Sequence, residues 1–137
     1  MKNQSEQMVT AARACLGTPF HHQGRKANVG LDCIGLVIVA LQAVGTNVQD
    51  NTYYGRRPDG ISLINALEQH GARRVTEIQT GDVLVFRYDR QPQHVALAID
   101  GNHMIHSFAP AGRVVETDIG DYWQRRLSGI YRFSFPA

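Results

Sequence analysis

The spacing of apolar residues predicts helices in the first half of the chain. Between residues 8 and 16 these residues recur three and four positions apart, which is typical of an amphipathic helix. Ser5 is its predicted cap, and Gly17 and Pro19 mark its end. Cys15 lies on the apolar stripe of this helix, so we interpret it as a small core residue.

Two further helices follow from similar signals. Asp32, a favourable N-cap residue, precedes the apolar run of residues 33–41, and the predicted helix ends near Gly45. Ser62–His70 carries leucines one turn apart and is followed by Gly71, which can adopt the left-handed conformation that ends a helix. Residues 46–60 are predicted to form a loop.

The period of the pattern changes after residue 82. Short apolar segments separated by turn sequences such as "DGN" and "PAG" predict strands. The predicted strands cover residues 83–86, 94–99, 103–108, 113–117 and 129–135. Helices followed by a meander of strands predict an α+β fold, in which the N-terminal helices pack on a central antiparallel β-sheet.

Composition narrows the class of protein. The chain has 137 residues, of which 43% are hydrophobic, so it is long enough for one domain core, and we expect a single domain over residues 1–137. The net charge of +2 is too small to favour nucleic acid or an anionic membrane as partner. Two cysteines exclude a disulfide framework. The sequence has no signal-peptide pattern and no apolar run that could span a bilayer, so we expect cytoplasmic synthesis without a leader.

Cys33 is the first candidate for chemistry. In the first turn of a helix, unpaired N–H groups and the helix dipole stabilise a thiolate and can also stabilise an oxyanion. The alternative is that Cys33 is a small buried hydrophobic residue, and this stretch alone leaves both interpretations open.

A nucleophilic cysteine needs a base, and the hairpin around "DGN" offers His94 and His106. If "DGN" forms a three-residue loop, Ala96 pairs with His106, and both histidines lie on one face of the sheet. A two-residue loop would send the two imidazoles to opposite faces. The small Ala96 and Ala98 on the His94 face predict that the helix bearing Cys33 docks there.

Four segments in order resemble a known family. "LGTPF", "LDCIGLV", "TGDVLVF" and "HVALAIDGNHMIH" are similar to the pattern of NlpC-type cell-wall peptidases, which are papain-like cysteine enzymes that cut peptidoglycan stem peptides. The resemblance covers about residues 8–110. The segments "HHQ" and "YWQRRLSGIYRF" are most similar to the branch found in phage and prophage tail modules.

This resemblance implies roles for individual residues. Cys33 matches the nucleophile, His94 the base and His106 the residue that orients the base. No cofactor or metal is implied. The implied substrate is the amide bond between D-glutamate and the diamino acid of the stem peptide.

Substrate-binding residues follow from the same comparison. Asp32 matches the family, whereas Phe20 stands where a tyrosine is common, so His21 or His22 could supply the missing polar group. Ile34 replaces the usual serine after the cysteine. These two departures affect the prediction of substrate more than that of catalysis.

Two other classes of protein remain open. Cys33, His94 and His106, with His103, could hold a metal, although strand alternation puts His103 and His106 on opposite faces. The chain could also be a non-catalytic tail or scaffold protein that keeps the fold. The tail-module resemblance predicts phage tail proteins as partners, and a location in the virion from which the protein acts on the cell wall. Aromatic residues could line the site or only pack: Tyr53, Tyr54 and Trp123.

Overall fold

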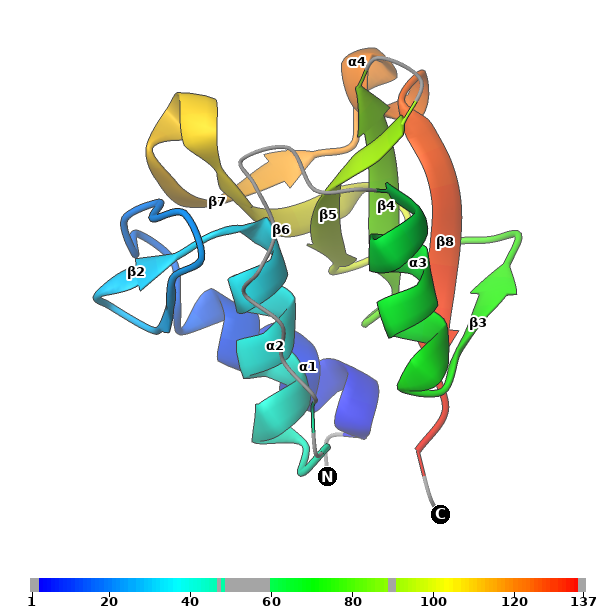
Figure 1. Ribbon diagram of the computed structural model, residues 1–137, viewed down its shortest axis with the longest axis horizontal. Coiled ribbons are helices and arrows are strands. Elements are labelled where there is room, and N and C mark those ends of the chain that lie inside the picture. The colour runs from blue at the N-terminus through cyan, green and yellow to red at the C-terminus, as the bar shows by residue number, and fades with distance from the viewer. Residues whose placement is uncertain (1–2, 47, 49–59, 89–90, 136–137) are drawn as a thin grey trace.

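The computed structural model describes residues 3–46, 48, 60–88 and 91–135. Helices and a six-stranded antiparallel sheet form an α+β fold, as predicted (Figure 1). The strand order is β3-β8-β4-β5-β6-β7, and a separate two-stranded sheet pairs β1 with β2. Tyr53, Tyr54 and most of the predicted loop over residues 46–60 lie outside the described residues.

The elements follow the predicted order with several additions. The helices are α1 (Gln4–Arg13), α2 (Cys33–Ala43), α3 (Gly60–Gln69) and α4 (Asp121–Gln124), with a 3₁₀ turn η1 (Ala109–Ala111). The strands are β1 (Arg25–Lys26), β2 (Gly30–Leu31), β3 (Ala72–Val75), β4 (Val83–Tyr88), β5 (Gln91–Ala98), β6 (His103–Phe108), β7 (Arg113–Asp118) and β8 (Leu127–Phe133). The sequence pattern missed β1, β2, β3 and α4. None of the described helices combines the length and apolar character needed to cross a membrane.

The first helix begins earlier than predicted. Its N-cap is Asn3, whose side-chain oxygen accepts a hydrogen bond of 2.8 Å from the backbone N–H of Glu6. The prediction of Ser5 as cap is therefore wrong, because Asn3 lies at the spacing that satisfies a first-turn N–H. Cys15 follows the helix and is buried, as expected of a core residue.

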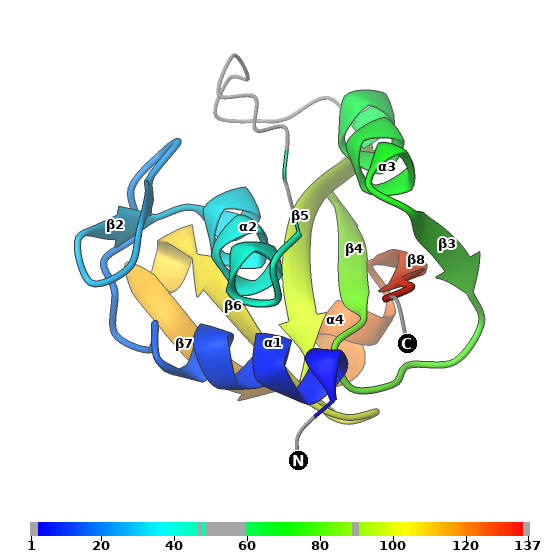
Figure 2. The same cartoon turned by 90° about the horizontal axis from the view of Figure 1, so that it is seen from below.

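The two faces of the sheet bury different kinds of side chain. Figure 2 shows α1 and α2 on the same face of the sheet. Branched residues such as Val95 and Leu97 join Cys33 and the apolar side of α2 in one core cluster. Ala96 and Ala98 belong to a second cluster on the other face, together with Trp123 of α4.

The predicted docking of α2 on the alanine face is therefore wrong. The branched side chains of the other face offer more apolar area to bury against α1 and α2. The short side chains of Ala96 and Ala98 instead leave room for the rings that gather around Trp123.

The hairpin between β5 and β6 has the register of a three-residue loop. Leu97 pairs with Ile105 and Ala98 with Met104, and the N–H of Ile99 donates to the carbonyl of His103 over 2.9 Å. Extended along both strands, this register puts His94 and His106 on one face, as predicted, and their rings are joined by a hydrogen bond of 2.8 Å.

Candidate active site

Cys33 is the first residue of α2, and Asp32 caps this helix as predicted. The Asp32 carboxylate accepts a hydrogen bond of 2.8 Å from the backbone N–H of Gly35. The sulfur of Cys33 is hydrogen-bonded by backbone N–H groups, among them that of Val95 in β5. Val95 directly follows His94, so the nucleophile candidate lies against the strand that carries the base candidate.

Burial favours the protonated form of the Cys33 thiol. Burial raises its pKa to about 12, the charge of Asp32 adds to this rise, and the backbone N–H groups only partly oppose it. The predicted lowering of this pKa by the helix start is therefore wrong, because the cost of burying a charge exceeds the stabilisation by the helix dipole. Cys33 as a whole is only 9% exposed.

A chain of hydrogen bonds runs from His94 into the sheet. Nε2 of His94 lies 2.8 Å from Nδ1 of His106, and Nε2 of His106 lies 3.1 Å from Oγ1 of Thr117. If His94 donates from Nε2 and His106 donates to Thr117, Nδ1 of His94 keeps a free lone pair that can accept a proton. Each hydrogen bond of this series then has one donor and one acceptor.

Both imidazoles are neutral in this surrounding. Burial lowers the pKa of His94 to about 3, with a further lowering by His106, and burial lowers the pKa of His106 to about 4. With a protonated Cys33, the unliganded pair is therefore thiol and imidazole. Burial therefore disfavours a thiolate–imidazolium pair in this state, since it opposes both charges.

A β-bulge lies next to His94. Phe86 of β4 pairs with His94 and Arg87 pairs with Pro92, so that Gln93 has no partner in this ladder. Bulges bend a strand and re-aim the neighbouring side chain, and they occur often next to active sites. The kink therefore lies immediately before His94.

Rings enclose the two histidines. Trp123 stacks on His94 with ring centroids 5.4 Å apart and meets His106 edge-on at 5.1 Å. Phe108 stacks on His106 at 5.1 Å, and Phe86 lies 4.9 Å from Trp123. Trp123 is buried, so it packs on the histidine pair and holds both rings in place.

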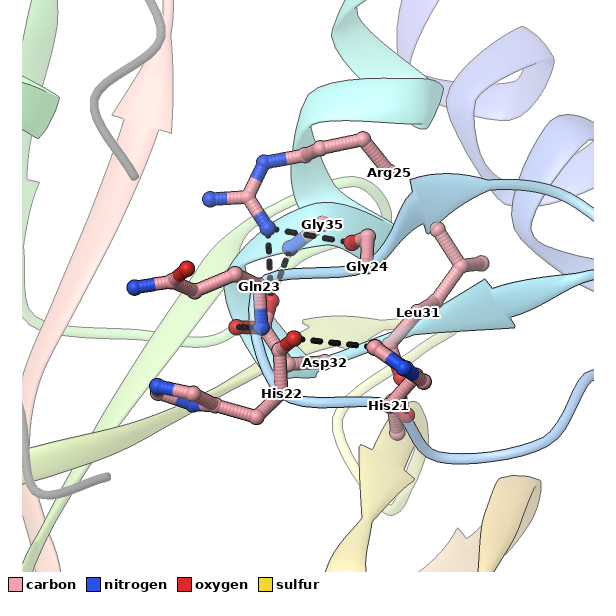
Figure 3. A network of polar contacts seen from close by, with 9 residues as sticks. His21, His22, Gln23, Gly24, Arg25, Leu31, Asp32 and Gly35 are labelled. Carbon is pink, nitrogen blue, oxygen red and sulfur yellow. Dashed lines mark hydrogen bonds and ion pairs between the residues drawn. The ribbon is translucent and has the colours of Figure 1, made fainter. Parts of the chain in front are cut away.

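Asp32 also holds the loop that precedes it (Figure 3). Its Oδ1 accepts from Nη1 of Arg25 at 3.0 Å, and its Oδ2 accepts from the backbone N–H of Gln23 at 2.9 Å. Nη1 of Arg25 also donates to the carbonyl of Gly24 at 3.0 Å. The buried carboxylate, whose side chain is 5% exposed, thus ties the chain before Cys33 to the start of α2.

The other predicted substrate-binding residues lie in the same loop. His21 is exposed and His22 is partly exposed, and both lie near Asp32 in Figure 3. Phe20 is partly buried, forms a bridge with Leu31 and donates its N–H to the carbonyl of Gly112.

The metal alternative lacks its ligand set. In the part of the chain that the structure describes, no three His, Cys, Asp or Glu side chains are grouped to hold a metal ion. His103 is exposed and forms ion pairs with Asp100 and Asp118, on the face opposite to His106 as strand alternation predicted.

Thr117 was missed by the sequence analysis. Alternation along β7 places it on the His106 face once the register of β6 and β7 is known, because His106 pairs with Val115, two residues away. The predicted strands 103–108 and 113–117 leave a four-residue loop, which could have indicated this register.

Comparison with known proteins comes from one family model and from solved structures. The model of the NlpC/P60 family matches residues 17–132. No curated protein matches the chain.

The fold is similar to solved structures of this family. An NLP/P60 family protein from Staphylococcus aureus, described as similar to lipoprotein, has a TM-score of 0.73 and 20% identity, over 97% of this chain and 42% of its own. The peptidoglycan hydrolase RipB from Mycobacterium tuberculosis has a TM-score of 0.72 and 21% identity, over 96% of this chain and 66% of its own. The NlpC/p60 domain of the peptidoglycan hydrolase SagA has a TM-score of 0.69 and 22% identity, over 94% and 98%. The chain thus spans less than half of the staphylococcal protein but nearly all of the SagA domain.

Proposed function

Because the chain belongs to the NlpC/P60 family, we propose that it is a cysteine peptidase that hydrolyses an amide bond in peptidoglycan stem peptides. The observation that carries this proposal is the hydrogen bond of 2.8 Å between His94 and His106 beside the helix start at Cys33. The descriptions of RipB and of SagA as peptidoglycan hydrolases support the substrate class.

The proposed reaction begins from the neutral pair. As the sulfur of Cys33 attacks the amide carbonyl, Nδ1 of His94 takes the thiol proton, and His106 holds the other ring nitrogen. Backbone N–H groups at the start of α2 stabilise the oxyanion. His94 then gives its proton to the leaving amine, and water hydrolyses the thioester to free Cys33.

The burial of Cys33 and His94 affects when the proton is transferred in this reaction. Charge separation in the free protein is disfavoured, so proton transfer accompanies attack on the bound peptide instead of preceding it. Neutral imidazole at ordinary pH is the form that a general base requires.

The scissile bond and the biological setting are further parts of the proposal. We propose cleavage between D-glutamate and the diamino acid, with Asp32, Phe20, His21 and His22 near the bound peptide, on the basis of the family resemblance. A role in wall penetration by a phage tail, with tail proteins as partners, is supported by the "HHQ" and "YWQRRLSGIYRF" segments.

Digestion of purified peptidoglycan tests the activity and the bond. We expect mass spectrometry to identify products with a new amino group on the diamino acid, and none with Cys33→Ala. Cys15→Ala is the matched control, since it removes the other buried thiol and should retain activity. A correctly folded protein that releases no product would contradict the peptidase and favour the scaffold alternative. Recovery of the protein away from tail particles after prophage induction would contradict the tail role alone.

A further inference from the structure

One arginine and two tyrosines form a cluster next to the histidine pair. Trp123, which stacks on His94, contacts Tyr122 edge-on with ring centroids 5.0 Å apart. The guanidinium carbon of Arg126 lies 3.7 Å from the centroid of the Tyr122 ring. The hydroxyl of Tyr88 is hydrogen-bonded to Tyr122. We call Tyr88, Tyr122 and Arg126 the Arg126 cluster.

The backbone holds this cluster in a fixed arrangement. Tyr88 is the last residue of β4, and α4 lies beside that end of the strand (Figure 1). The carbonyl of Arg126 accepts from the N–H of Arg87 at 2.8 Å, and Nη2 of Arg87 donates to the carbonyl of Arg125 at 3.0 Å. The turn that follows α4 is thus tied to β4.

Arg126 has unused capacity for hydrogen bonding. Its Nη1 donates to the carbonyl of Tyr122 at 3.0 Å, and in the described part of the chain this is the one hydrogen bond of its guanidinium group, which has five N–H donors. The side chain is partly exposed. Cation–π contact with Tyr122 orients the plane of the group without using its donors.

The segment that carries Arg126 has more basic than acidic residues. Among the described residues, none of Arg87, Arg125 and Arg126 forms an ion pair with an acidic side chain. Asp121 is the one acidic residue between positions 119 and 129. A carboxylate that approached Arg126 would therefore find a partner in its guanidinium group.

Trp123 links the cluster to the histidine pair, because it contacts Tyr122 on one side and stacks on His94 on the other. Within the cluster, burial and the hydrogen bond with Tyr122 raise the pKa of Tyr88, and the charge of Arg126 lowers it.

We propose that the Arg126 cluster is a subsite that binds a carboxylate of the peptide substrate beside the scissile amide, with Arg126 as the charged partner. The inference rests on the proposed function and adds to it a preference for a free carboxylate over a carboxamide. Stem peptides offer two sources, the α-carboxylate of D-glutamate and the free carboxylate of the diamino acid.

Paired substrates test the subsite. Kinetics of full-length protein are measured on stem peptides with both carboxylates free, with only the D-glutamyl carboxylate amidated, and with only the diamino acid carboxylate amidated. Arg126→Gln should raise KM about tenfold on the free peptide with little change in kcat, because a charged hydrogen-bonded pair is lost. Arg126→Lys should recover part of this effect. Amidation of the recognised carboxylate should abolish the difference between wild type and Arg126→Gln, and this identifies the source.

Arg125→Gln is the matched control. Arg125 is exposed and lies one position before Arg126. The variant removes the same charge and should change KM less than about twofold. Equal effects of the Gln variants at positions 125 and 126, or an Arg126→Gln defect that is the same on free and amidated peptides, would overturn the subsite.

Binding of the peptides to the Cys33→Ala protein distinguishes a failure of the carboxylate subsite from a failure of the proposed peptidase activity. Calorimetry should give a dissociation constant about tenfold weaker for the amidated peptide. If the wild-type protein hydrolysed the free and the amidated peptides equally well, only the subsite would be overturned. Absence of both hydrolysis and binding would overturn the peptidase as well.

Discussion

His94 and His106 are joined by a hydrogen bond of 2.8 Å between Nε2 and Nδ1, and Trp123 covers both rings. His106 is completely buried and His94 is 6% exposed. The orientation of the His94 ring is therefore set before any substrate binds, and its other nitrogen, Nδ1, is the one left for the proposed reaction.

Cys33 and His94 should act as one unit. Each alanine variant is expected to lower the rate of peptidoglycan hydrolysis by more than about a thousandfold, because thiol and base act in the same step. The double variant should be scarcely slower than either single variant. Additive losses in turnover assays would show that the two residues act in separate steps.

His106 should matter for orientation. His106→Ala is expected to lower kcat about tenfold to a hundredfold, since the base remains but its ring is no longer held. His103→Ala serves as control, because this exposed side chain pairs with Asp100 and Asp118 away from the site. An inactive His103 variant together with an unaffected His106 variant would contradict the assignment.

Thr117 should support His106 through its hydroxyl. Thr117→Val keeps the shape and removes the acceptor at 3.1 Å, so we expect a loss in kcat of about threefold to tenfold. Thr117→Ser should retain near wild-type kcat. If the serine variant is as impaired as the valine variant, packing of the methyl group is what matters.

The buried histidines should make stability depend on pH on the acid side. The folded-state pKa values of His94 and His106, about 3 and about 4, lie below the ordinary value of 6.5. Their contribution to the free energy of unfolding is therefore fully present above pH 6.5 and is lost as the pH falls toward these values. The loss amounts to roughly 3 kcal/mol for His106 alone.

Urea unfolding between pH 7 and pH 4 measures this effect. His106→Gln should flatten the pH dependence of the free energy of unfolding, whereas His103→Gln should leave the histidine contribution in place. A wild-type curve that does not fall over this range would contradict the neutral buried pair.

Alkylation of Cys33 should require high pH in the unliganded protein. The raised pKa of its thiol keeps the thiolate fraction small at neutral pH, so the rate in a Cys15→Ala background should still rise above pH 9. Labelling with iodoacetamide across pH 6 to 11 measures this profile. A plateau already reached at pH 7 would show that a thiolate–imidazolium pair forms without substrate.

Local sequence determined that a helix starts at Cys33. The N–H group that Asp32 caps belongs to Gly35, only three residues further along the chain. No distant segment is therefore needed to place the thiol of Cys33 in the first turn. The register of the "DGN" hairpin is also local, and with strand alternation it brought His94 and His106 to one face.

Only the tertiary structure decided how these pieces meet. Periodicity cannot tell which face of a sheet a helix covers, and here the branched residues Val95 and Leu97 bury more area against α2 than Ala96 and Ala98 could. The pKa values of Cys33 and His94 were equally beyond the sequence, because burial by segments far apart in the chain opposes the local effect of the helix start.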